Sequence, residues 1–472
     1  MSELSKESVK AFLGGSWIVL GNLSVSLAGL LFWLIMPRLI GLRNLGEASE
    51  IISAAMLATT LVSAGLPLAV IREVAELGED GYLAATFTGL GLALFGGVLA
   101  IGLATLLGYG EYYLVSFLLA FLSIASVPLI QGLIGLERYV AFFRALLAAS
   151  LTKLVIGITL GLLGYGLLAA LSGYLAQPSV FLIIALPVLP RLARRASLRR
   201  AVRYVKRVVG LTASNYPQAV SLQLMSVLSI YLFALIAGKP VNTGALYISL
   251  MAVLALSMIP NALMTAALPI SVESGKESII GDQLRIGLGI SIPIIAFFVA
   301  APRFTLRLIK PELAGIAGSA FLIMLLSVVP LVAVQAAVNI LNKRRDERGL
   351  LAIGAIRLLV LIVAILLLAA PLGLNGAALA FLLANLAALP IALRVLGTGA
   401  KTVLLAWGLQ VLFAPLYVLD TSSLMQLVIG FLAAGISALA VHSLSILRLR
   451  EATSLVRLFA RSLLYARQGA RK

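Results

Sequence analysis

The stretch that decides the fold of this chain covers residues 349–370 and reads GLLAIGAIRLLVLIVAILLLAA. It is apolar throughout except for one charged residue, Arg357. A helix rises about 1.5 Å per residue, so a run of this length matches the hydrocarbon core of a bilayer, which is about 30 Å thick. The sequence therefore predicts a transmembrane helix here.

Runs of the same kind follow one another along the chain, whose residues are 61% hydrophobic and 11% charged, with a mean hydropathy of +1.11. Soluble domains are about 45–50% apolar and about 25% charged. The chain is therefore predicted to be an all-α polytopic membrane protein. The first run, which ends near Met36, is too long for a signal peptide and is expected to be a retained helix. Cysteine is absent, which excludes disulfides and thiolate metal sites.

About fourteen transmembrane helices are expected. Their predicted ranges are 11–37, 48–71, 82–108, 113–134, 140–163, 164–190, 208–237, 243–270, 283–302, 313–341, 349–370, 373–393, 402–419 and 422–447. Two divisions need tight turns, at residues 164–166 and 371–373, and both segments contain the glycine that such turns favour.

The distribution of Lys and Arg gives these helices an orientation. Of the 36 basic residues, twenty-eight fall in loops and tails on the side of the N-terminus and six in loops on the other side. This bias matches the positive-inside rule, so both termini are predicted to be cytoplasmic. It also accounts for the net charge of +18 without a nucleic-acid partner.

The densest basic stretch, residues 191–207, falls between the sixth and seventh predicted helices and is interpreted as a cytoplasmic linker. We expect residues 1–190 and 208–400 to form two pseudo-symmetric six-helix bundles. Leu66-Pro67 and Leu268-Pro269 occupy corresponding places in the two halves, as expected for the internal repeats of transporters. Residues 401–447 would form two extra helices, and 448–472 an interfacial basic helix or a solvated tail.

The membrane interior lacks the groups that most enzymes need. The one acidic residue within a predicted span is Glu50, at the outer edge of the second, and the one histidine is His442, near the end of the last. Paired carboxylates, nucleophile–base pairs and metal clusters are therefore not expected, and no ATP-binding loop motif occurs. We predict that the chain is not an enzyme and carries no cofactor or metal.

Two cations do lie within predicted spans. Lys153 is near the middle of the fifth and Arg357 is near the start of the eleventh, at a separation of 204 positions that makes them nearly equivalent in the two halves. Burying such a charge costs about 2.5–3.5 kcal/mol on insertion scales. They are predicted to face a cavity that binds a substrate phosphate, the alternative being that both side chains snorkel to the cytoplasmic interface.

Side-chain amides form a second candidate set. Asn22 lies midway along the first span, and Asn215 and Gln218 lie in the seventh beside Pro217, which frees a backbone carbonyl. These amides would bind sugar hydroxyls, or they would form ordinary interhelical hydrogen bonds of about 0.6 kcal/mol.

Three segments resemble a known group of transporters. Residues 32–46, FWLIMPRLIGLRNLG, and 61–72, LVSAGLPLAVIR, are similar to the start of polysaccharide-biosynthesis flippases of the multidrug/oligosaccharidyl-lipid/polysaccharide (MOP) exporter superfamily. Residues 373–385, GLNGAALAFLLAN, are similar to the twelfth-helix region of the same group. The likeness extends over essentially the whole length.

The resemblance implies two six-helix bundles around a central cavity that opens alternately to each side. The first and seventh helices would line this cavity, which places Asn22, Asn215 and Gln218 there. The substrate would be a polyprenyl-linked phosphate or pyrophosphate oligosaccharide, moved from the cytoplasmic to the outer leaflet for polysaccharide or glycoprotein glycan synthesis. The chain would act as a monomer among lipids of the cell membrane, with the last two helices accommodating the lipid tail.

Three other functions stay open at this stage. A cation-coupled multidrug or small-solute exporter of the same fold is disfavoured because that branch often carries an acidic residue within the membrane. A membrane glycan polymerase or ligase is disfavoured because its catalytic groups usually need longer outer loops. A scaffold that transports nothing is the third.

The topology can be tested with single cysteines, because the chain has none of its own. Cysteines at Ser2, Ser197 and Gly469 should react only with a reagent supplied from inside, and one at Asn242 only from outside, because of the charge bias. External labelling at position 197 would contradict the two-half arrangement.

Overall fold

The computed structural model describes residues 6–185, 198–274, 278–344, 346–419, 422–444 and 446, and within these ranges it contains helices and short turns but no strand. The elements are α1 (Lys6–Ser63), α2 (Leu66–Leu106), η1 (Gly110–Tyr112), α3 (Tyr113–Gly135), α4 (Tyr139–Leu162), α5 (Leu167–Ala185), α7 (Leu198–Ala237), α8 (Pro240–Ser274), α9 (Ser278–Ala300), α10 (Pro302–Ile309), α11 (Pro311–Leu326), α12 (Val328–Arg344), α13 (Glu347–Leu372), α14 (Leu374–Leu396), α15 (Gly399–Phe413), η2 (Ala414–Val418) and α16 (Ser423–Ser443). The expected all-α membrane fold is confirmed.

Twelve segments of the described chain are long and apolar enough to cross a membrane. The predicted count of fourteen differs at two places. The first predicted span and most of the second lie in α1, and the seventh contributes only the shorter apolar helix Leu224–Ala237. The exact count therefore stays a prediction.

α1 is too long to be a single transmembrane span. Its 58 residues would extend about 87 Å as a straight helix, far beyond a hydrocarbon core of about 30 Å. Gly41, at φ 79° and ψ 163°, interrupts the helical backbone, and Pro67 then opens α2 where it needs no N–H partner. The second predicted span thus contains the break between α1 and α2.

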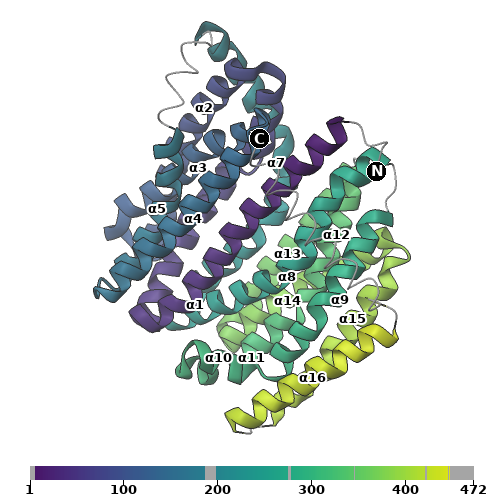
Figure 1. The fold of residues 1–472 in the computed structure, drawn as a ribbon. Coiled ribbons are helices and arrows are strands. Elements are labelled where there is room, and N and C mark those ends of the chain that lie inside the picture. The colour runs from purple at the N-terminus through teal and green to yellow at the C-terminus, as the bar shows by residue number, and fades with distance from the viewer. Residues whose placement is uncertain are drawn as a thin grey trace.

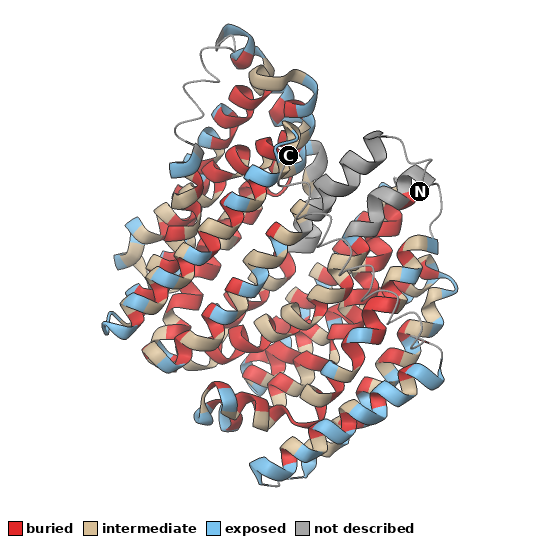
Figure 2. Cartoon of the chain, viewed as in Figure 1, coloured by how far each residue is buried: buried red, intermediate tan, exposed pale blue. Residues whose placement is uncertain are grey.

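The helices form two groups with α1 and α7 between them (Figure 1). Helices α2–α5 lie on one side and α8–α16 on the other. α1 packs against α2, α4 and α8, and α7 packs against α2 and α13. Buried residues occur throughout both groups (Figure 2), and the largest hydrophobic cluster includes residues of α1 and of both groups.

The close contact of α1 with the second group is that with α8. A Cβ atom added at Gly46 would lie 1.6 Å from the carbonyl oxygen of Pro240, and one added at Gly244 would lie 3.0 Å from the nitrogen of Gly46. Nearby, Arg38 Nε donates to the carbonyl of Ile309 at 2.8 Å and its Nη2 donates to that of Leu308. These carbonyls end α10, where helices leave such groups without partners. The contacts hold together the end predicted to face outward.

At the predicted cytoplasmic end, the start of α7 is tied to α2 by ion pairs. Arg207 contacts Glu73 at 2.9 Å and also Glu76, and Arg200 contacts Asp80 at 3.3 Å. The hydrogen bond to Glu76 raises the pKa of the Arg207 guanidinium. The second part of the predicted linker is therefore helical, while residues 191–197 and the predicted tail at 448–472 lie outside the described residues.

The contact at Gly46 predicts that the stability of the protein depends sharply on the size of the side chain at this position. Gly46→Ala should destabilise the protein by about 1–3 kcal/mol through overpacking against Pro240. Gly408→Ala in α15 is the matched control: an added Cβ there meets open space, and alanine favours a helix over glycine by about 1 kcal/mol. Thermal unfolding of the purified variants measures both, and equal melting temperatures would contradict this account of the junction.

Candidate functional site

Lys153 lies in α4 and its side chain is buried between α1 and α5. Its ammonium group is 3.4 Å from the centre of the Tyr174 ring and 5.2 Å from that of Phe32. Aromatic faces attract cations by about 0.5–2 kcal/mol. Among the described residues, no carboxylate forms an ion pair with Lys153, so the aromatic rings compensate part of the cost of burying its charge.

Phe32, Trp33, Tyr174 and Tyr247 form a cluster around this lysine, here called the aromatic cluster. Trp33 Nε1 donates to the Tyr174 hydroxyl at 2.7 Å, and the hydroxyls of Tyr174 and Tyr247 are 3.0 Å apart. Tyr247 belongs to α8, so this chain of hydrogen bonds crosses between the two helix groups. Lys153 is thereby linked to the α1–α8 contact.

Two glycines make room for the cluster. A Cβ atom at Gly157 of α4 would lie 2.3 Å from the Phe32 ring, and one at Gly173 of α5 would lie 2.7 Å from it. The ring therefore fits between α4 and α5 only because both helices lack a side chain there. This packing places the Phe32 ring 5.2 Å from the Lys153 ammonium group.

Arg357 lies in α13 and is also buried. Its Nη2 donates to Asn385 Oδ1 at 3.0 Å, and Asn385 Nδ2 donates to the carbonyl of Phe381 at 2.9 Å. The Nε atom of Arg357 has no hydrogen-bond partner. An α14 amide thus orients the guanidinium but leaves it with unused donor capacity.

The two cations are 5% and 3% exposed, so both side chains are buried within the protein. Their role in a cavity and the snorkelling alternative stay predictions. The structure does not bring the two cations together. Lys153 contacts residues of α1 and α5, whereas Arg357 contacts α14.

The structure gives less information about the three predicted amides. Asn22 of α1 is exposed. Asn215 and Gln218 lie within α7, and their side chains are outside the described part of the structure. The cavity role of all five predicted residues therefore stays a prediction.

Glu50 is more buried than its place at the edge of a span indicates, with 5% of its surface exposed. The hydroxyl of Tyr109, in the turn after α2, donates to its carboxylate at 2.6 Å, while Oε1 has no partner. Burial, and then this hydrogen bond, raise the pKa of Tyr109 above its ordinary value. Glu50 is thus a buried carboxylate between α1 and the α2–α3 connection.

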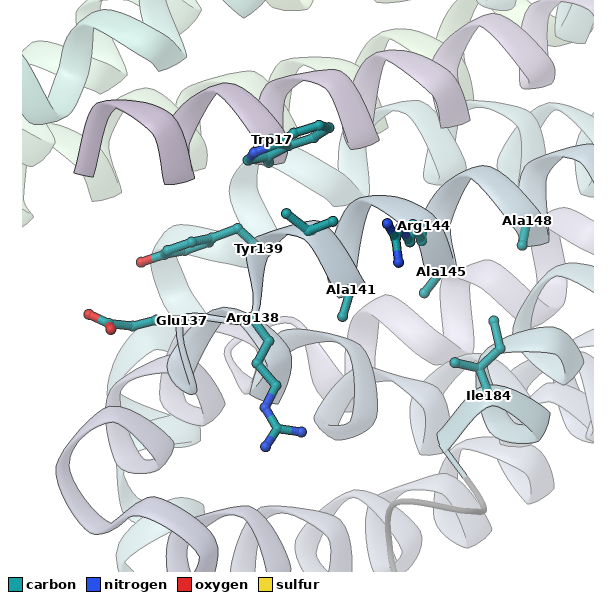
Figure 3. A pocket seen from close by; sticks show the side chains of 10 residues that line it. Trp17, Glu137, Arg138, Tyr139, Ala141, Arg144, Ala145, Ala148 and Ile184 are labelled. Carbon is teal, nitrogen blue, oxygen red and sulfur yellow. The ribbon is translucent and has the colours of Figure 1, made fainter. Parts of the chain in front are cut away.

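A cavity of about 790 Å³ opens at the predicted cytoplasmic end of α1, α4 and α5 (Figure 3). Trp17, Arg138, Arg144 and Ile184 are among its lining residues, and none of the five predicted site residues is. In the sequence, these two arginines counted only toward the orientation of the helices in the membrane. The aromatic cluster was not predicted, although tyrosines inside apolar runs could have indicated it.

Comparison with known proteins depends on the fold, because neither a family model nor a curated protein matches the sequence. The lipid II flippase MurJ, in an inward closed conformation, superposes with a TM-score of 0.70 and 15% identity, over 90% of this chain and 99% of that one. The multidrug transporter DinF-BH superposes with a TM-score of 0.57 and 15% identity, over 85% and 98%. A MATE transporter in complex with MaL6 gives 0.52 and 15%, over 84% and 96%.

The chain has the fold of the MOP exporter superfamily. The resemblance stated from the sequence is thereby confirmed at the level of fold, and with it a multi-pass membrane protein. The MOP fold is common to flippases and multidrug exporters, so it does not by itself select a substrate.

The Arg357–Asn385 pair can be tested by a double-mutant cycle. Asn385→Leu should cost about 1–3 kcal/mol, because the buried guanidinium loses its acceptor. Adding Arg357→Leu should recover part of this loss, since the charge that needs the amide is then absent. Thermal unfolding of the four proteins gives the coupling energy, and strictly additive effects would show that the hydrogen bond is not the stabilising contact.

Proposed function

We propose that this MOP-fold protein is a flippase that moves a polyprenyl-phosphate- or pyrophosphate-linked oligosaccharide from the cytoplasmic to the outer leaflet by alternating access. The observation that carries the proposal is the pair of buried cations, Lys153 and Arg357, neither of which is neutralised by a described carboxylate. A phosphate group would supply the missing negative charge.

The contacts of Lys153 suit a reversible site. An ammonium group over an aromatic face gains about 0.5–2 kcal/mol, while a charge-assisted hydrogen bond to phosphate is shorter and about twice as strong as a neutral one. A substrate phosphate can therefore replace the ring contacts, and the rings can take the lysine back after release. A buried salt bridge to a carboxylate would hold the lysine more firmly.

The link from Lys153 to the α1–α8 contact supports coupling between binding and opening. Movement of Lys153 away from Tyr174 would disturb the ring whose hydroxyl contacts Trp33 and Tyr247. Outward movement of an anionic substrate is favoured by about 2.3 kcal/mol per charge per 100 mV, inside negative. The membrane potential and the substrate gradient are the driving forces that this proposal needs.

The remaining features of the proposal come from the sequence and the fold comparison. MurJ, named as a lipid II flippase, aligns over nearly its whole length and with a higher TM-score than the multidrug transporter DinF-BH and the MATE structure. The protein would reside as a monomer in the cell membrane with both termini cytoplasmic. Helices α15 and α16, which follow the second group, would accommodate the lipid tail.

Substitution of the buried cations tests this function. Lys153→Gln and Arg357→Gln should each reduce flipping of a fluorescent polyprenyl-phosphate sugar in liposomes at least about tenfold, the effect of losing about 1.4 kcal/mol of binding. Lys153→Arg should be milder because it keeps the charge. Arg394→Gln, at an exposed position on α14, is the matched control and should flip normally. Wild-type rates for the double Gln variant would refute the role of both cations.

A cation-coupled exporter is the second candidate, favoured by the buried carboxylate of Glu50 and by the likeness to multidrug transporters. The same liposomes distinguish the two functions when potential and ion gradients are set independently. A flippase driven by potential keeps working when a proton or sodium gradient is removed at constant potential. A cation-coupled exporter stops.

A further inference from the structure

The cavity at the predicted cytoplasmic end has an apolar side built from small residues. Ala141, Ala145 and Ala148 are spaced four and three positions apart and therefore share one face of α4. Figure 3 shows these alanines in a row, with Ile184 facing them from α5. Their short side chains line the cavity together with Trp17 of α1 and Ile184 of α5, and this cavity is here called the α4 groove.

The charged side of the groove is basic. Arg138 precedes the first residue of α4 and Arg144 lies six residues further along the chain, and both are exposed. Neither forms an ion pair with a carboxylate in the described parts of the chain. Glu137 also lines the cavity, but Figure 3 shows its carboxylate and the Arg138 guanidinium pointing apart. Arg138 thus stands before the alanine row and Arg144 beside it, with their guanidinium groups apart in Figure 3, and each guanidinium can bind an anion bidentately.

This combination fits an amphipathic anion. A free phosphate or nucleotide would use the arginines but would gain nothing from the alanine row. A long apolar chain with a phosphate at one end uses both. The position agrees, because Trp17 lines the cavity and tryptophans concentrate at the level of lipid headgroups.

The groove and the environment of Lys153 are built from the same helices. Both are bounded by the same three helices: Trp17, Ala145 and Ile184 come from α1, α4 and α5, as do Phe32, Lys153 and Tyr174. Along α4, Ala145 and Lys153 are eight residues or about 12 Å apart. Phe142 and Leu146, on either side of Ala145 in the sequence, pack against Gly21 of α1.

We propose that the α4 groove is the loading site at which the phosphate of the polyprenyl-linked substrate docks from the cytoplasmic leaflet, with Arg138 and Arg144 binding the phosphate and the alanine row receiving the first isoprenoid units. This inference rests on the proposed flippase function and adds an entry site to it. The substrate phosphate then has basic groups at two depths along α4.

Thiol protection tests the site directly, because the native chain contains no cysteine. The full-length Ile184→Cys variant is placed in phosphatidylcholine nanodiscs, and the rate of its reaction with a maleimide is measured with and without long-chain polyprenyl phosphate. The rate should fall about fivefold at about four times the Kd, by mass action. Ile183→Cys, an exposed neighbour that does not line the groove, should show no protection.

Two sets of variants identify the contacts. In the Ile184→Cys background, Arg138→Gln with Arg144→Gln should abolish protection, while Arg394→Gln should leave it unchanged. Ala148→Trp, which fills the groove and keeps both charges, should also prevent protection. Since both arginines are exposed, their replacement leaves the buried core intact.

Three outcomes would overturn the proposal. They are equal protection by uncharged polyprenol, equal protection by phosphatidylglycerol at the same mole fraction, and full protection in the double arginine variant. The flipping assay is independent of this measurement. Wild-type flipping without thiol protection would remove the loading site and keep the flippase, whereas protection without any flipping would refute the flippase.

Discussion

The contact on which the rest of the structure depends is the close approach of α1 to α8. Gly46 and Gly244 allow the two backbones to meet at a distance that any side chain would prevent. The approach brings Tyr247 to within hydrogen-bonding distance of Tyr174, and with it the environment of Lys153. Since lipid offers little hydrophobic drive between helices, small residues and interhelical hydrogen bonds supply much of such an interface.

The helices themselves could be predicted from the sequence, because a chain within lipid must satisfy every backbone group internally. Apolar runs such as residues 349–370 admit no other structure. Their limits were harder to predict where glycine is involved. Two predicted spans lie in the one long element α1, which is interrupted at Gly41 through a positive φ that no periodicity of apolar residues reveals.

Side-chain partners were less predictable because they depend on which helices become neighbours. Tyr174 contacts Trp33 across 141 positions and Tyr247 across 73. Glu73 fell in a predicted loop because charged residues surround it, yet it is fully buried since Arg207, 134 positions away, neutralises it. Lys153 and Arg357 could be singled out from sequence alone, because a charge in an apolar run is conspicuous. The residues that surround each cation could not be predicted from the sequence.

The surroundings show that equivalent positions need not be equivalent sites. Arg357 is oriented by the amide of Asn385, which is itself fixed to a backbone carbonyl, so its side chain is held within the second helix group. Lys153 rests on rings and reaches, through Tyr174, a residue of the opposite group. A ligand that draws the lysine off its ring changes a contact between the groups, whereas one that binds Arg357 does not have to. Of the two cations, Lys153 is therefore the one whose occupancy can be transmitted to the α1–α8 contact.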